Sequence, residues 1–144
     1  MAKGMDVTEA EIHEFFKIPG AAADLAEMAV VRKLMGWRRA AKASWHDYID
    51  DQGKRWKFRS IAASGLRFNA SKRRCARDRF AEAGFQRQLS QLEGFVLADV
   101  FTFPRLDVHL VETKTLRRWH AERRLGASTY VSRKKLLRML KERN

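Results

Sequence analysis

The sequence predicts an α/β protein of the α+β kind, with a small central mixed β-sheet of about four to five strands flanked by helices. Two segments predict the sheet: 56–62 alternates apolar and polar side chains, and 95–103 is a nearly continuous apolar run, typical of a covered strand. Stretches with helical periodicity precede and follow them. A chain of 144 residues can bury one core, so we expect a single domain over 1–144. Within it we expect an N-terminal helix in 1–20, a core in 21–112 and basic helices in 113–144.

The first two helices are predicted from capping and periodicity. Thr8 and Glu11 have capping-box spacing, which indicates a helix over 8–17 that ends before Pro19. A second helix is expected over 22–35, stopped by Gly36. Glu27 lies on its apolar face, and a buried carboxylate needs a cation, a metal ion or hydrogen-bond donors.

The centre of the chain predicts a β-hairpin. Residues 37–44 alternate weakly and could form a first strand. Residues 50–53 (DDQG) supply turn chemistry, in which Gly53 can adopt a positive φ. The strand that follows would place Trp56 and Phe58 on a core face and Lys57 and Arg59 on the other.

The second half predicts further helices and a second hairpin. We expect a helix over 72–83 that ends at Gly84, and strands over 95–103 and 108–111 joined by a turn at 104–107. Helices are then expected over 113–124 and 133–143. A short Gly-containing connection and a basic second helix resemble a helix-turn-helix, although many αα-hairpins share this pattern without touching DNA.

The composition favours a polyanionic partner. Thirty Lys and Arg against 17 Asp and Glu leave a net charge of +13, which suits nucleic acid first and an acidic membrane second. The single cysteine, Cys75, excludes an internal disulfide and a cysteine-based zinc cluster. No run is long and apolar enough for a membrane span, and no signal-peptide pattern is visible, so we expect a cytoplasmic protein. The predicted nucleic-acid-binding residues are Lys54, Arg55, Arg67, Lys72, Arg73, Arg74, Arg77, Arg79, Arg133, Lys134 and Arg138.

The hairpin also resembles a known family. An aspartate, a turn and a strand ending in x-hydrophobic-Lys is similar to the PD…(D/E)xK motif of the restriction-endonuclease-like superfamily. Asp47 precedes Arg59 by the twelve positions that separate the corresponding residues in some bacterial members. The resemblance covers roughly 20–120. It implies a site built from Glu27, Asp47, Lys57 and Arg59, with Asp47 and Glu27 as the Mg²⁺ ligands if the site is active.

The motif departs from the family at two positions. Lys57 stands where the family has an acidic residue or glutamine, and it would repel a divalent ion. Arg59 stands where the family has lysine, and its pKa makes it a poor proton-transfer group, although it binds phosphate well. The sequence therefore predicts a nucleic-acid-binding protein, for DNA more than RNA, with an impaired nuclease motif and with protein partners or a second copy beside it.

Several alternatives stay open at this point. An active Mg²⁺-dependent endonuclease could use Glu27, Asp47 and Asp50. It could instead use Glu112 and Lys114, a literal ExK with Asp99 and Asp107 upstream. Glu27 could also serve only as an ion-pair partner of Arg59 or Arg38. A basic structural protein of a ribonucleoprotein is the third possibility.

Overall fold

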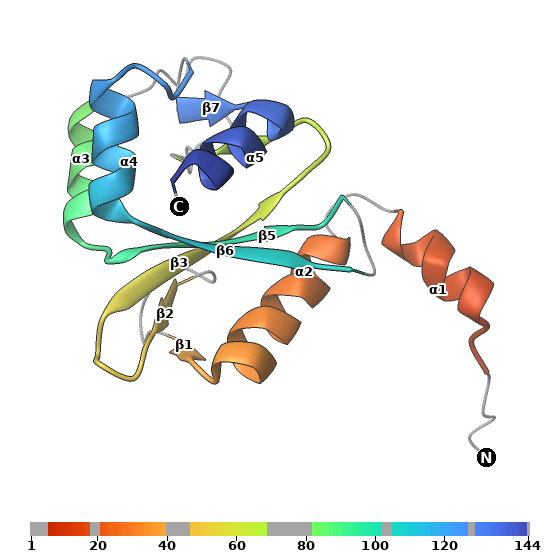
Figure 1. Cartoon of the computed structure of the whole chain (residues 1–144). Helices are drawn as coiled ribbons and strands as arrows, with labels where there is room; N and C mark the ends of the chain where they lie inside the picture. Colours follow the sequence, from red (N-terminus) through yellow and green to blue (C-terminus); the bar gives the residue numbers. More distant parts are fainter. Residues whose placement is uncertain are drawn as a thin grey trace.

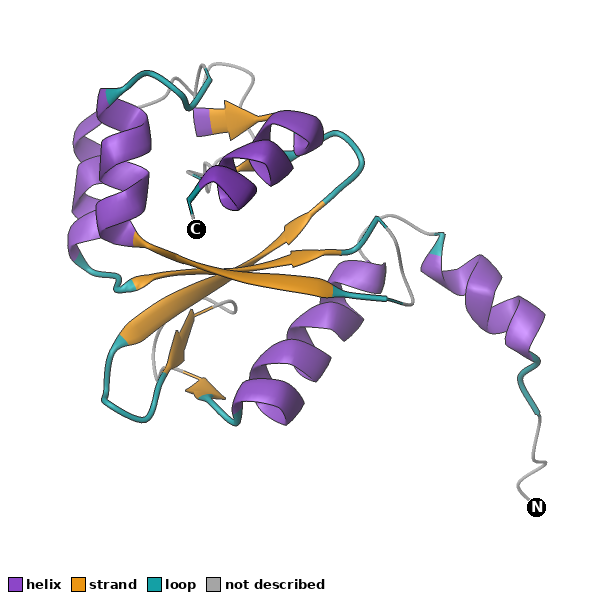
Figure 2. Cartoon of the chain, viewed as in Figure 1, coloured by secondary structure: helices purple, strands orange, loops and turns teal. Residues whose placement is uncertain are grey.

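The computed structural model describes residues 6–17, 21–39, 47–68, 82–101, 105–126 and 129–143. Its main feature is a mixed five-stranded sheet with helices on both sides, beside a separate two-stranded sheet (Figures 1 and 2). The elements in chain order are α1 (Glu9–Phe16), α2 (Ala21–Glu27) with its π-helical continuation η1 (Met28–Met35), β1 (Arg38–Arg39), β2 (Asp47–Ile49), β3 (Arg55–Ile61), β4 (Leu66–Arg67), α3 (Glu82–Ser90), β5 (Gly94–Asp99), β6 (Asp107–Glu112), α4 (Thr113–Ala121), β7 (Tyr130–Val131) and α5 (Arg133–Glu142). The α+β class and the mixed sheet are confirmed.

The main sheet has the order β1-β2-β3-β5-β6. Only the central pair, β3 and β5, is parallel; its neighbours run antiparallel. Gly94 allows the strands to approach closely here, because a Cβ at this position would lie 2.3 Å from the Val111 carbonyl oxygen and 2.7 Å from the Trp56 ring. The smaller sheet pairs β4 with β7.

Each face of the main sheet carries its own core. Helices α3, α4 and α5 cover one face, burying Phe95 and Leu97 of β5 beneath Trp119 and Leu136 (Figure 1). We call this the three-helix face. Helix α2 and η1 cover the other, the α2 face, where Val31 packs with Tyr48, Trp56 and Phe58. A strand's two faces alternate along the chain, so the odd-numbered residues of β3 point to the three-helix face and the even-numbered ones to the α2 face.

The central hairpin forms as predicted. Gly53 has φ +77°, and Asp50 closes the turn by accepting hydrogen bonds from the backbone nitrogens of Gln52 and Lys54, both at 2.9 Å. The capping box of Thr8 and Glu11 is also present, and Gly36 ends η1 with φ +69°.

Three predicted boundaries are wrong, and the end of a fourth element, the first strand, lies outside the described residues. Gly84 lies inside α3 instead of ending a helix, and the predicted 72–83 helix otherwise falls outside the described residues. The first strand shows only Arg38–Arg39, and 40–46 likewise lie outside the description. Strand β5 ends at Asp99, whose carboxylate accepts from the Phe101 backbone nitrogen at 3.1 Å. Helix α4 ends at Ala121.

The end of α5 reaches the edge of the sheet. β6 is an outermost strand, and Arg143, just after α5, donates a hydrogen bond to the Leu110 carbonyl oxygen on that strand. The last helical turn is therefore tied to the sheet by a polar contact as well as by the apolar packing of Leu136, Met139 and Leu140.

Candidate functional site

The hairpin brings Asp47 and three cations to one face. Asp47 of β2 pairs directly with Lys57 of β3, and residues opposed in this way point to the same side of a sheet. Strand alternation adds Arg55 and Arg59 to that side. The four side chains therefore share the three-helix face, and we call them the Asp47 cluster.

Asp47 is the only carboxylate among the four side chains of the cluster. An Arg55 Nη2 donates to Asp47 Oδ2, and Lys57 Nζ lies 3.9 Å from Oδ1. The Asp47 and Lys57 side chains are only 7% and 13% exposed. Within the described part of the chain, Asp47 Oδ1 and the Nε atoms of Arg55 and Arg59 are buried without a hydrogen-bond partner. The four side chains of the cluster thus comprise three cations and one carboxylate in a largely buried place, where the Nε atoms of Arg55 and Arg59 have unused hydrogen-bonding capacity.

Within the cluster, burial has an unfavourable effect on the positive charge of Arg59. Desolvation by burial lowers the pKa of its guanidinium, and the negative charge of Asp47 only partly opposes this effect. An arginine stays protonated in proteins all the same, so the sheet holds a poorly solvated positive charge here. Such a charge is stabilised when an anion approaches it.

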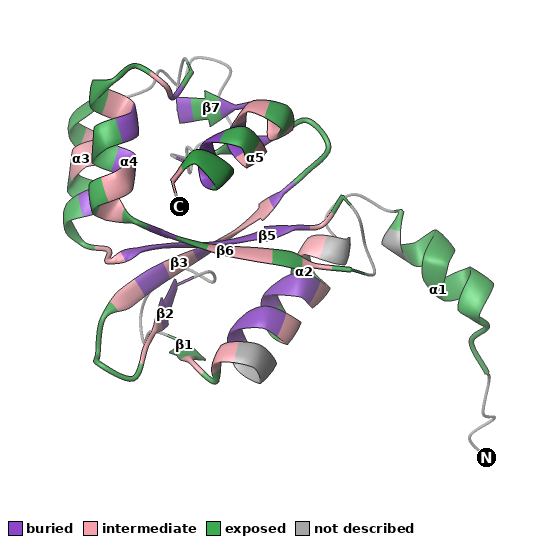
Figure 3. Ribbon diagram, in the orientation of Figure 1, coloured by how far each residue is buried: buried purple, intermediate pink, exposed green. Residues whose placement is uncertain are grey.

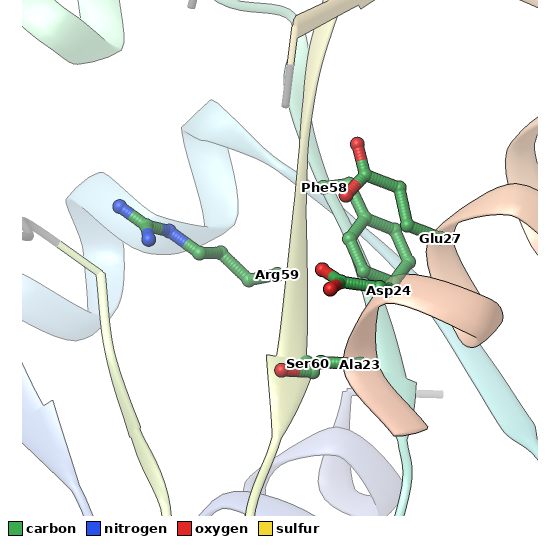
Figure 4. A pocket seen from close by; sticks show the side chains of 6 residues that line it. All are labelled: Ala23, Asp24, Glu27, Phe58, Arg59 and Ser60. Atoms are coloured by element: carbon green, nitrogen blue, oxygen red, sulfur yellow. The ribbon is translucent and has the colours of Figure 1, made fainter. Parts of the chain in front are cut away.

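Glu27 does not join this cluster. It is 8% exposed on α2, and the Tyr48 hydroxyl donates a hydrogen bond to Glu27 Oε1 on the α2 face. Burial, and then the Glu27 carboxylate, raise the pKa of the Tyr48 phenol. Figure 4 shows the Arg59 side chain pointing to the opposite side of β3 from Glu27 and Asp24. The expected Glu27–Arg59 ion pair is therefore wrong, and the sheet separates Glu27 from Asp47.

A small cavity lies on the Glu27 side. It has a volume of about 200 Å³ and is lined by Ala23, Asp24, Glu27, Phe58, Arg59 and Ser60 (Figure 4). Two carboxylates of α2 face it, whereas the Arg59 side chain leads away from it. The charged side chains that face this cavity are acidic, whereas most of those in the Asp47 cluster are basic.

The described residues do not fit a bound Mg²⁺. Among them, no group of three or more His, Cys, Asp or Glu side chains is placed to share a metal ion. Asp47 is flanked by cations, and Glu27 lies across the sheet. Asp50 is used structurally, since its second oxygen accepts from Trp56 Nε1 at 2.9 Å. Burial acts to raise the pKa of Asp50, but the hydrogen bonds from Trp56, Lys54 and Gln52 outweigh it and lower the pKa.

The residues of the second ExK motif are not brought together into one site either. Glu112 and Lys114 form an ion pair at 2.8 Å where β6 passes into α4, with side chains 48% and 81% exposed. Their hydrogen bond lowers the pKa of Glu112 and raises that of Lys114. In the β5–β6 register Glu112 pairs with Gly94, whereas Asp99 pairs with Asp107 at the other end. Five residues of strand, roughly 17 Å, separate the two ends.

The predicted nucleic-acid-binding residues divide into four groups. Arg55 and Arg133 are bound internally: Arg133 holds Asp99 through two hydrogen bonds, at 2.6 and 3.2 Å. Lys54 lies 3.3 Å from Glu93 at the surface. Arg67, Lys134 and Arg138 are exposed. The others, Lys72, Arg73, Arg74, Arg77 and Arg79, lie outside the described residues.

The suggested helix-turn-helix is wrong. Strand β7 comes between α4 and α5 and pairs with β4, so the two helices are not joined by a short turn. Thr129, immediately before β7, has φ +61° and is 1% exposed.

Two contacts of the candidate site were not predicted from the sequence. Arg55 has the right spacing to join Lys57 and Arg59, since all three are odd-numbered along one strand, whereas the sequence-based prediction includes it only among the nucleic-acid-binding residues. Nothing local marked Tyr48 as the donor to Glu27, because that contact joins residues 21 positions apart.

Comparison with known protein-family models finds no match, and comparison with curated protein sequences finds none either. The relationship to restriction-endonuclease-like proteins therefore stays a prediction. None of the described helices combines the length and apolar character that a membrane crossing requires.

Proposed function

We propose that this protein binds nucleic acid, DNA in preference to RNA, with the Asp47 cluster as a phosphate anchor and without an effective nuclease centre. The observation that supports this most is the cluster itself, in which three cations of β3 stand beside one carboxylate. An approaching phosphate would add negative charge beside these cations and could supply hydrogen-bond acceptors for the Nε atoms of Arg55 and Arg59.

The rest of the chain supplies long-range attraction. A net charge of +13 concentrates polyanions near the surface, and exposed cations such as Arg67, Lys134 and Arg138 can track a phosphate backbone. We further propose that the protein acts in the cytoplasm, beside partner proteins, and that its resemblance to a nuclease lies in its scaffold and not in catalysis.

The test is a binding titration followed by fluorescence anisotropy. Duplex DNA, single-stranded DNA and RNA of equal length are compared for the natural protein, Lys57→Met and Lys114→Met. Lys114→Met is the matched control, because it removes the same charge from an exposed site. Lys57→Met is expected to weaken DNA binding at least about tenfold and to reduce the salt slope by about 1. Equal losses in both variants would contradict a specific anchor.

Two alternative functions are outcomes of companion measurements. Tighter binding of RNA than of duplex DNA would favour the ribonucleoprotein function. Plasmid cleavage that requires Mg²⁺ or Mn²⁺ and is lost in Asp47→Ala would establish the endonuclease and overturn an inactive centre.

A further inference from the structure

Helix α1 differs from the rest of the molecule in charge and in exposure. Residues 6–17 hold four acidic side chains against a single lysine, whereas the whole chain carries +13. Every described side chain from Asp6 to Phe15 is exposed (Figure 3). Among them are Val7, Ile12 and Phe15, at 59%, 44% and 55% exposure. Figure 1 shows α1 projecting from the body beyond α2.

The helix is nevertheless well specified by its own sequence. Thr8 and Glu11 form a complete capping box, with the Glu11 carboxylate 2.8 Å from the Thr8 backbone nitrogen. Val7 and Ile12 occupy the two positions of a hydrophobic staple. Eight residues are too few for a helix to be stable alone in water, so a helix so clearly encoded requires a surface to pack against.

The charge of α1 determines what that surface is. Glu9 and Glu14, 91% and 71% exposed, would be repelled by nucleic acid or by an anionic membrane. A basic surface with apolar residues suits them. Only four residues, 17–20, lie between α1 and α2. They span at most about 14 Å, which restricts the part of its own body that α1 can reach. A second copy has no such restriction.

The outer side of α5 offers such a surface. Lys134, Arg138 and Lys141 follow one another at helical spacing and are exposed, with half-buried Leu137 among them. This stripe is positive where α1 is negative. A reciprocal exchange, in which each α1 packs on the other copy's α5, would give a closed twofold dimer with two identical contacts.

We propose that α1 is a docking helix that binds the Lys134–Arg138–Lys141 stripe of a second copy of this chain. This dimerisation does not depend on nucleic-acid binding. The second copy would thus be recognised by complementary charge and by the exposed apolar residues Ile12 and Phe15.

The test measures the dissociation constant of the dimer by sedimentation of the full chain, at about 50 mM and about 500 mM salt. We expect a dimer that weakens as salt rises, because exposed charges are screened. Glu9→Lys/Glu14→Lys and Lys134→Glu/Lys141→Glu should each raise the dissociation constant at least about tenfold. Glu11 is left unchanged to preserve the cap. Combining all four substitutions should restore dimerisation, since the charges are exchanged.

Two further variants separate this contact from general effects. Asp51→Lys/Glu122→Lys makes the same change in charge at exposed sites elsewhere and should leave the dimer intact. Ile12→Ser/Phe15→Ser should dissociate it, whereas Leu110→Ser, at a similarly exposed apolar residue, should not. A natural protein that stays monomeric at low salt, charge variants that stay dimeric, or a combined variant that fails to recover would each overturn the proposal.

Discussion

Asp47 and Lys57 face one another across the β2–β3 pair, yet their charged atoms are 3.9 Å apart and the closer partner of Asp47 is Arg55. The single carboxylate is therefore shared among cations, so it has a structural role as well as a position in the proposed phosphate anchor.

Removing the carboxylate should destabilise the fold and strengthen polyanion binding. Asp47→Asn keeps the size of the side chain but removes the negative charge beside the cations of β3. We expect a loss of about 2–3 kcal/mol in the free energy of unfolding, less than for a fully buried pair because Arg55 is 37% exposed. Urea denaturation measures the first effect and anisotropy the second. Unchanged stability together with weaker DNA binding would contradict this role.

Arg59 should show the opposite behaviour. Its burial lowers the pKa of the guanidinium and leaves its Nε without a hydrogen bond among the described residues. Arg59→Met should keep or raise the free energy of unfolding, by up to about 2 kcal/mol, while DNA binding falls. Chemical denaturation and anisotropy on the same preparation test both effects. If the variant unfolds more easily and binds DNA normally, Arg59 is a structural residue.

The Tyr48–Glu27 contact predicts a dependence of stability on alkaline pH. The pKa of Tyr48 is raised in the folded state. The stabilisation that the neutral phenol gives the folded state is therefore fully present below the ordinary pKa of about 10, and it is lost as pH rises through the pKa of the folded state. Tyr48→Phe should reduce the free energy of unfolding at pH 8 by about 1–3 kcal/mol. It should also flatten the decline above pH 10. Tyr130→Phe, at a residue that is 39% exposed, is the control.

Arg133 should affect stability more than binding. Arg133→Met would leave Asp99, whose side chain is 2% exposed, without its ion pair, and would remove the guanidinium that lies 4.5 Å from the Phe101 ring. We expect the midpoint temperature to fall by roughly 5–10 °C. DNA affinity should change no more than in Lys134→Met. A larger loss of affinity in Arg133→Met would return Arg133 to the binding surface.

The sequence predicted features that depend on neighbouring residues and missed those that depend on distant ones. The turn at Gly53, the alternation of Trp56 and Phe58 and the cap at Thr8 follow from local spacing, and all are present. The position of Glu27 was predicted on an inward helix face, but no local pattern says which side of the sheet that helix covers. The same holds for Arg133, whose partner Asp99 lies 34 positions away.

The helix end predicted at Gly84 is wrong for a related reason. Glycine is a common helix terminator, yet Gly84 lies within α3, where Phe85 and Leu89 are held against the three-helix core. Tertiary packing there outweighs the intrinsic cost of about 1 kcal/mol for a glycine inside a helix.

The bond from Arg143 to the Leu110 carbonyl oxygen has a consequence for self-association of another kind. An unprotected outer strand can recruit strands from other molecules and seed fibrous aggregates. With Arg143 in place, one of the backbone acceptors of β6 is already occupied. Shortening the chain by its last two residues would free that acceptor, and storage at high concentration should then produce thioflavin-positive material sooner than the intact protein does.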